Sequence, residues 1–233
     1  MDFLNFDYAP ETFLILNLVA AGVVFLAFLM TFTMTDRPWH RYLLFFWVEQ
    51  LCVFIWFLFV GIAQAVLNIP LFLVSLYASV PAGFGALLVF DAISRDRTEP
   101  IKLALFTGLS LVNIIMWAQP DAIHFAQDPN GDILLYYAGS YAILATLQVA
   151  FVGIVWVIVS ILINVHAPKA LKSTTRLNLV GGIIVGIVAP ALSLSGLNLK
   201  IPSGFNNLII ATGCFIMAMA IRRNEKIGFI LPF

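Results

Sequence analysis

Charged residues are scarce in this sequence. Only 10% of its 233 residues are charged, whereas 62% are hydrophobic, and an ordinary soluble domain has about a quarter of its residues charged. So few charges cannot cover a water-facing surface, which excludes a soluble globular domain and indicates that lipid is the main solvent. The formal net charge is +0, so the charge balance does not point to nucleic acid, and no nucleic-acid partner is predicted.

Cysteines and catalytic motifs are also lacking. The two cysteines, Cys52 and Cys214, fall inside apolar runs, which is typical of buried thiols and not of a disulfide or a metal site. The chain has no phosphate-binding P-loop, HExxH, GxSxG or CxxC pattern. The last apolar run carries no lysine, which disfavours a retinal protein, because the retinal Schiff base needs one. We therefore predict neither an enzyme nor a cofactor.

Long apolar runs take the place of these features. A helix that crosses a bilayer needs about 20 mostly apolar residues, and the breaks between the runs carry proline, glycine, asparagine and aspartate, which favour turns. The break before the third run is very short, so the second and third helices should be antiparallel neighbours. The N-terminal segment MDFLNFDYAPE has no basic region, so we expect no cleaved signal peptide. The sequence predicts a single all-α domain of seven transmembrane helices at residues 12–34, 42–67, 70–93, 102–118, 134–164, 177–197 and 205–221.

The basic residues predict the orientation of this bundle. Under a seven-span topology, 11 of the 12 Lys and Arg residues fall on one side of the membrane, and only Lys200 falls on the opposite side. Cytoplasmic loops carry the excess of Lys and Arg, so we predict a multi-pass protein of the cell membrane with its N-terminus outside and its C-terminus inside. Arg222 and Arg223 should mark the point where the last helix leaves the membrane. The predicted cytoplasmic basic face contains Arg37, Arg41, Arg95, Arg97, Lys169, Lys172, Arg176, Arg222 and Arg223.

One acidic residue lies well within a predicted span. Glu49 is about two helical turns, roughly 10 Å, from the cytoplasmic end of the second helix. Ionisable groups inside a membrane are costly and indicate a functional site. Glu49 is either a neutral or paired group of the bundle interior, or a switching group, and the residue pattern leaves both open. Asp91 lies near Arg95, four residues on, and an ion pair along one helix explains it.

A second set of polar residues falls in the outer part of the spans. Amide and phenol groups on several helices suit a pocket for a small polar or amphipathic ligand, although Tyr and Asn are also common at membrane interfaces. In the loop QPDAIHFAQDPNGD, the residues Asp121, His124, Asp128 and Asp132 are sparse for a metal site, and DPNGD is typical of a turn, so no metal is predicted. The predicted outer pocket consists of Gln64, Tyr77, Asn113, Tyr137, Tyr141, Asn198, Asn206 and Asn207.

Two prolines interrupt predicted helices. Pro81 lies in the third span and is followed by Gly83 and Gly85, whereas Pro190 lies in the sixth span after Gly182 and Gly186. Small residues four apart let helix backbones approach closely, and proline frees a backbone carbonyl. The pattern therefore predicts close packing at both places, and it is also compatible with hinges that let the outer helix ends move.

Three stretches resemble a known family. DRPWHRYLLFFWVEQLCVFIW, LYASVPAGFGALLVFDAI and LVGGIIVGIVAPALSLSG, the last followed by a helix that ends in Ala-Ile, Arg-Arg and a later Ile-Leu-Pro, are similar to the seven-transmembrane sensor region found ahead of membrane histidine kinases. The resemblance covers nearly the whole chain and consists of hydropathy and turn patterns, without catalytic signatures. No kinase part follows Pro232, so the output would be a further domain or a separate partner on the basic face.

The resemblance implies a membrane sensor that binds a small extracellular or membrane-borne ligand and passes a conformational signal to a cytoplasmic partner. Two other classes stay open. A small-solute transporter is compatible with prolines near the middle of the membrane, although the first three and last three spans show no convincing repeat. A membrane scaffold or assembly protein needs no ligand. The lipid bilayer is the one partner that composition alone predicts, and a homo-oligomer is compatible with every class.

Overall fold

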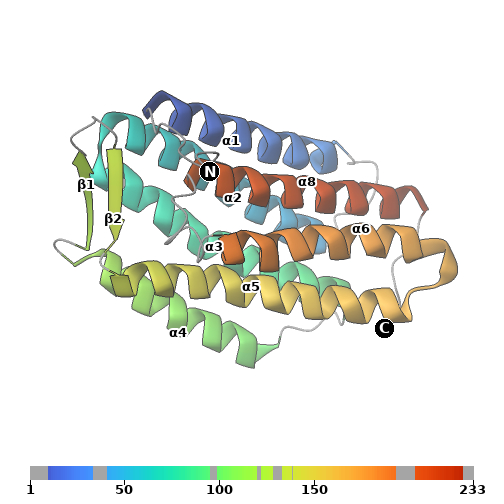
Figure 1. The fold of residues 1–233 in the computed structure, drawn as a ribbon. Coiled ribbons are helices and arrows are strands. Elements are labelled where there is room, and N and C mark those ends of the chain that lie inside the picture. Colours follow the sequence, from blue (N-terminus) through green and yellow to red (C-terminus); the bar gives the residue numbers. More distant parts are fainter. Residues whose placement is uncertain are drawn as a thin grey trace, which may run out of the picture.

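The chain forms a bundle of long helices in the computed structural model (Figure 1). The structure describes residues 10–33, 41–94, 99–119, 122–127, 133–137, 139–192 and 203–227. Seven helices are long and apolar enough to cross a membrane, which confirms the predicted all-α bundle and shows a multi-pass membrane protein. The elements are α1 (Pro10–Phe32), α2 (Arg41–Val66), α3 (Ile69–Ser94), α4 (Pro100–Trp117), β1 (Ile123–Gln127), β2 (Ile133–Tyr137), α5 (Gly139–His166), η1 (Lys169–Leu171), α6 (Lys172–Ile183), η2 (Ile184–Val188) and α8 (Ser203–Ile227).

The helices pack as a ring. α2 packs on α1 and α3, α5 packs on α6, α6 packs on α8, and α8 returns to α1. α4 lies at the edge of the bundle against α3 and α5 (Figure 1). The α2–α3 pair is the most extensive, which confirms that the short break makes these two helices neighbours. In that break, Asn68 accepts a hydrogen bond from the backbone N–H of Leu71 at 2.8 Å, so its side chain caps the start of α3.

The lipid-facing character of the bundle is clearest in α4. The buried residues of this helix are Phe106, Ser110, Asn113 and Trp117, spaced so that they share one helical face. The opposite side carries Ile101, which is 75% exposed, and other exposed aliphatic residues. A helix that buries a serine and an asparagine and exposes its aliphatic side chains is inverted relative to a helix in water, because its outer solvent is lipid.

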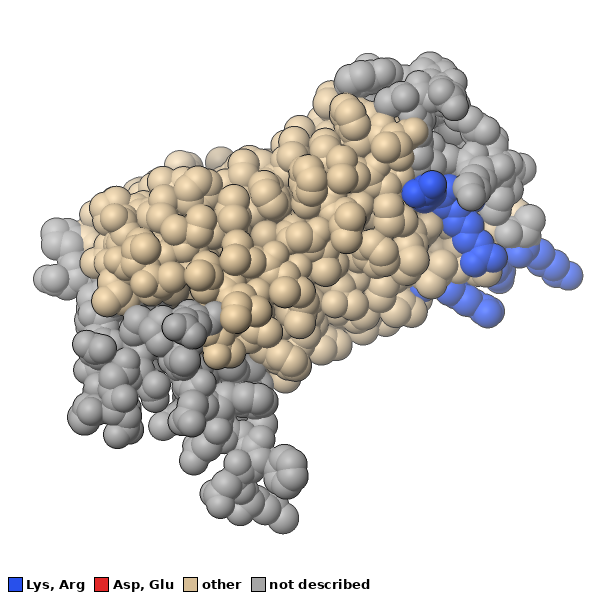
Figure 2. Space-filling model, turned by 90° about the horizontal axis from the view of Figure 1, so that it is seen from above, with Lys and Arg blue, Asp and Glu red and all other residues tan. Residues whose placement is uncertain are grey.

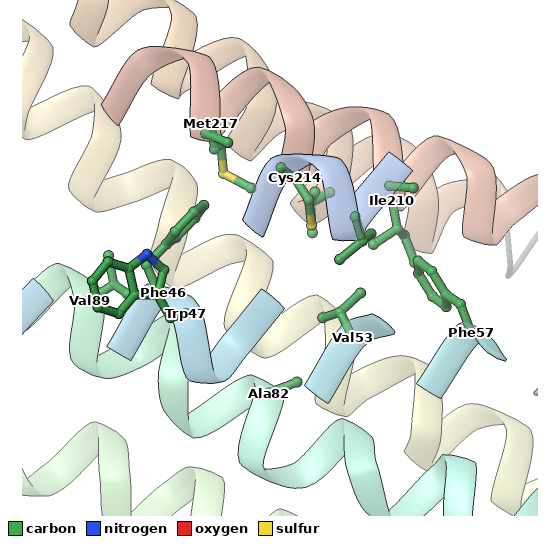
Figure 3. Packing of buried hydrophobic residues seen from close by; sticks show 14 of the residues in the cluster. Phe46, Trp47, Val53, Phe57, Ala82, Val89, Ile210, Cys214 and Met217 are labelled. Carbon is green, nitrogen blue, oxygen red and sulfur yellow. The ribbon is translucent and has the colours of Figure 1, made fainter. Parts of the chain in front are cut away.

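The main core lies among α1, α2, α3 and α8. Phe46, Trp47, Val53 and Phe57 of α2 belong to the same buried cluster as Ala82 and Val89 of α3 and Ile210, Cys214 and Met217 of α8, as Figure 3 shows. Phe46, Phe57 and Met217 are wholly buried. Burial of Cys214 agrees with the prediction of a buried thiol, and both cysteines are free.

A short hairpin replaces the start of the predicted fifth span. Residues 134–137 were expected to be helical as part of span 134–164, but Ile133–Tyr137 forms strand β2, and α5 begins at Gly139. β2 pairs antiparallel with β1, with Ile123 opposite Tyr137 and Gln127 opposite Ile133. Hydropathy cannot distinguish a short apolar strand from the first turn of a helix, so the prediction failed where a pairing partner was present.

The other boundaries differ by smaller amounts. The sixth helical segment begins at Lys169 and continues to residue 192, whereas the predicted span began at residue 177. α8 continues to Ile227, so Arg222 and Arg223 lie within the helix and do not end it. A helix that emerges into water or headgroups can continue, because its own hydrogen bonds satisfy the backbone there as well.

Basic side chains gather at one end of the bundle (Figure 2). This end carries the start of α6 and the last turns of α8, whereas α1 begins at the opposite end, beside the hairpin (Figure 1). Arg37, Arg95 and Arg97 lie outside the described residues, and for Arg41 only the backbone, at the start of α2, is described. The described basic side chains are those of Lys102, Lys169, Lys172, Arg176, Arg222 and Arg223.

Candidate functional site

A cavity of about 60 Å³ lies among the helices near the middle of the bundle. Its wall is mostly apolar and includes Trp56 of α2, Trp156 of α5, Val185 of η2 and Cys214 of α8. Three polar side chains also line it, namely those of Glu49, Ser79 and Gln148. A mostly apolar hollow with a few convergent polar groups is the usual form of a small-molecule site.

Glu49 is the one carboxylate in this wall. It lies on α2, where Gly85 of α3 lets the two backbones approach. A Cβ atom added to Gly85 would lie 3.0 Å from both the Cβ atom and the backbone nitrogen of Glu49. Glu49 is 3% exposed, and among the described residues its Oε2 has no hydrogen-bond partner. A buried polar atom without a partner costs about 1–3 kcal/mol, so the structure keeps an unused hydrogen-bonding group at the cavity.

Gln148 brings a second polar group to the cavity from α5. Its Oε1 accepts a hydrogen bond from Nδ2 of Asn113 on α4, and the same nitrogen also donates to the backbone oxygen of Leu144 at 3.3 Å. Because the carbonyl oxygen of Gln148 is engaged in this way, its amide N–H groups remain as donors. Ser79 donates its hydroxyl proton to Leu76 O at 2.6 Å. The cavity therefore combines the carboxyl group of Glu49 with an amide donor.

The π-helical turn η2 forms the wall beside α5. The backbone N–H of Ala189 bonds to Ile184 O, five residues back, and Pro190 follows at once. In a regular α-helix the ring of Pro190 would clash with the carbonyl group of Gly186, and the wider turn relieves this. Gly186 packs directly on Gly153 of α5, because a Cβ atom added to Gly153 would lie 2.0 Å from the Cα atom of Gly186. This contact confirms the close approach predicted at Gly186.

The two predicted hinges differ in their surroundings. Pro190 follows η2 in the chain and is buried. Pro81 is exposed, and the helix α3 continues past it to Ser94. Gly83, two residues after Pro81, receives the ring of Phe106. Movement at either proline stays a prediction.

Several residues of the predicted outer pocket make contacts that are separate from one another. Asn113 bonds to Gln148, whereas Asn207 of α8 donates to Oδ1 of Asn17 on α1 at 2.7 Å. Tyr77 is 37% exposed and packs against Trp117 with a ring-centroid distance of 6.0 Å. Gln64 is buried near the end of α2, Asn206 is half-buried, Tyr137 and Tyr141 belong to β2 and α5, and Asn198 lies outside the described residues. A pocket that joins these residues stays a prediction.

The Asn17–Asn207 bond connects the first and last helices and leads to a stability prediction. Asn207→Ala should lower the free energy of unfolding by about 1 kcal/mol, because Oδ1 of the buried Asn17 loses its donor. Thermal unfolding in detergent would measure the change. Thr212→Val is the matched control, since the exposed Thr212 hydroxyl bonds within its own helix to Leu208 O. Equal melting temperatures for the two variants would show that the bond contributes nothing.

Asp91, which was expected to pair with Arg95, pairs with a lysine of the next helix. Asp91 Oδ1 forms an ion pair with Nζ of Lys102 on α4, and Oδ2 accepts the backbone N–H of Glu99 at 2.9 Å. Arg95 lies outside the described residues. The turn between α3 and α4 brings Lys102 back onto α3, a contact across eleven residues that one-helix spacing does not show.

Sequence reasoning missed several residues of the cavity. Gln148, the one amide in the middle of the fifth apolar run, was a signal that could have been used, because an amide in lipid needs a partner. Ser79 and Phe106 carried no such signal. In the loop considered for a metal, the structure describes part of the hairpin, while Asp121, Asp128 and Asp132 lie outside it. Among the described residues, no group of three His, Cys, Asp or Glu side chains is placed to hold a metal ion.

Neither the models of known protein families nor the curated proteins give a match to this chain.

Proposed function

We propose that this chain is a receptor-like sensor domain of the cell membrane. A small ligand in the cavity beside Glu49 changes the packing of α8, and α8 transmits that change to a cytoplasmic output. The observation that supports this proposal is the composition of the cavity wall. Glu49 of α2, Val185 of η2, and Ile210 and Cys214 of α8 face the same small space. A molecule placed there touches both the buried acid and the helix that leads to the basic end of the bundle.

The orientation belongs to the same proposal. The end of the bundle where Lys169, Lys172, Arg176, Arg222 and Arg223 gather faces the cytoplasm, since cytoplasmic surfaces carry the excess of basic residues. The last turns of α8 then stand beside anionic headgroups, which attract Arg222 and Arg223. An output domain or partner would contact this basic end.

η2 supports a sensing role more than a fixed packing role. π-helical turns occur often at functional sites. Val185 of this turn lines the cavity, and the next residue, Gly186, packs on α5. A ligand that pushes on Val185 would therefore change the α5–α6 contact as well as the α8 contact. Two discrete helix arrangements of this kind are what a sensor needs.

Replacement of Glu49 tests the proposal. With a reporter domain fused after Phe233, Glu49→Leu should change the output about fivefold or more, which is the usual range of coupling between sites. Glu49→Gln keeps the size and one acceptor oxygen and should show a smaller change. Gly108→Ala is the control, since its added Cβ has no atom within 4 Å.

The outcomes separate three classes of function. Folded Glu49 variants with unchanged output would contradict the sensing role. Uptake of labelled solutes into proteoliposomes, lost in Glu49→Leu, would instead show a transporter, a class for which a cavity near the membrane midplane is also usual. Unchanged output without uptake would leave a scaffold or assembly protein.

A further inference from the structure

An aromatic ring from the edge helix α4 forms part of the cavity wall. Phe106 lines the cavity from α4, the helix at the edge of the bundle. Its neighbour Leu105 is 60% exposed on the outer side, whereas Phe106 itself is 1% exposed. The ring of Phe106 therefore lies between the cavity and the lipid-facing side of α4.

The ring of Phe106 occupies a notch that glycine provides. A Cβ atom added to Gly83 of α3 would lie 2.2 Å from Cζ of Phe106. Phe84 meets the ring edge-on at a centroid distance of 4.8 Å, and Phe151 stacks on it at 6.3 Å. These contacts are apolar and involve no hydrogen bond, so the ring can leave the notch without breaking a polar contact. α4 packs on its neighbours much less than α2 and α3 pack on each other.

The polar groups behind the ring select a particular chemistry. Glu49 offers an oxygen without a partner, and Gln148 offers amide N–H donors, because its Oε1 accepts from Asn113. A hydroxyl group can donate to one and accept from the other at the same time. It is also uncharged, so it crosses the apolar interior of the membrane at far lower cost than an ammonium or a carboxylate group.

We propose that the cavity binds the hydroxyl head of an apolar alcohol that arrives from the bilayer past Phe106. This inference rests on the proposed function and names the ligand class of that site. A volume of about 60 Å³ is roughly that of two water-sized groups, so the head and its first carbons fit inside. The rest of the apolar chain lies between α4 and its neighbours and continues into the lipid.

The test uses a photoreactive 1-dodecanol with a diazirine near the hydroxyl group, added to the full chain in lipid nanodiscs. After irradiation, mass spectrometry should locate adducts on peptides of α2, α3 or α5 that carry cavity-lining residues. Unlabelled 1-dodecanol should reduce this labelling, and dodecane should compete about tenfold less well, because it lacks the hydrogen bonds of the hydroxyl group. Labelling spread over lipid-facing peptides, with equal competition by dodecane, would overturn the proposal.

Variants of Glu49 distinguish the alcohol from a charged ligand. Glu49→Gln keeps an acceptor oxygen and should keep the labelling within about twofold, whereas Glu49→Leu should lower it about tenfold. Dodecylamine is the second competitor. If it competes better than 1-dodecanol and loses that advantage in Glu49→Gln, the ligand is cationic and the proposal of an alcohol is wrong.

Variants of Phe106 test the route. Phe106→Leu opens the notch with little risk to folding and should raise the initial rate of labelling several-fold, while Phe106→Trp should lower it. Gly108→Ala, two residues along the same helix with no atom near its added Cβ, should leave the rate unchanged. Equal rates in all three variants would exclude the route past Phe106.

These results can be told apart from a failure of the sensing role. Specific labelling together with an unresponsive reporter fusion would keep the alcohol site and reject the sensor. A reporter that responds to Glu49→Leu without any specific labelling would keep the sensor and reject the alcohol site.

Discussion

Gly186→Ala is expected to destabilise the protein strongly. The added Cβ atom would lie 2.4 Å from the backbone oxygen of Gly153 and 2.6 Å from its Cα atom. Backbone atoms cannot move aside as the end of a side chain can, so α5 and η2 would have to separate. Overpacking of this kind costs about 3 kcal/mol or more. We expect a large fall in the melting temperature in detergent and a smaller monodisperse fraction in size-exclusion chromatography.

Two other glycines provide matched controls for this prediction. An added Cβ at Gly22 or at Gly108 has no atom within 4 Å. Gly22→Ala and Gly108→Ala should be neutral or stabilising by up to about 1 kcal/mol, because alanine favours a helix over glycine. A melting temperature of Gly186→Ala that matches those of the controls would mean that η2 and α5 are not in backbone contact.

Lys102→Met is expected to give the second large effect. The ion pair of Lys102 with Asp91 is nearly removed from solvent, with side chains 12% and 4% exposed. Loss of the lysine leaves the carboxylate of Asp91 buried, and among the described residues the backbone N–H of Glu99 is then its one remaining donor. An uncompensated buried charge costs about 3–5 kcal/mol, so thermal unfolding should occur at a clearly lower temperature and α4 should loosen first.

A double variant checks the cause of that effect. Asp91→Asn combined with Lys102→Met removes both charges and should recover most of the lost stability, since no charge is then left alone. Lys169→Met removes an exposed lysine at the same end of the bundle and should change stability by less than about 0.5 kcal/mol. If the double variant is as unstable as Lys102→Met, the pair stabilises through packing and not through charge.

The two predictions concern contacts between different helices, and both bear on the cavity. The contact of Gly153 with Gly186 fixes η2, which supplies Val185 to the wall. The pair of Asp91 with Lys102 anchors the start of α4, one turn before Phe106. A milder variant at either place is therefore a tool for changing the cavity without touching Glu49.

The sequence by itself determined the solvent, the number of helices and their approximate limits. These properties depend on composition over about 20 residues, and the bilayer requires every spanning segment to be apolar and to satisfy its own backbone hydrogen bonds. Glu49 could be identified in the same way, because an acidic residue in an apolar run is conspicuous. The hairpin was not predicted, since β1 and β2 depend on pairing with each other.

Only the tertiary structure decided which polar side chains meet. Asn17 and Asn207 lie near opposite ends of the chain and bond to each other, and Asn113 of α4 donates to Gln148 of α5. Each of these contacts depends on how two helices are rotated about their axes and how far they slide along each other. In this bundle such positions are set by single residues, such as Gly83, Gly85, Gly153 and Gly186, where the absence of a side chain lets another helix approach. Hydropathy averages over those residues, so it predicts that helices cross the membrane and leaves open which of their faces touch.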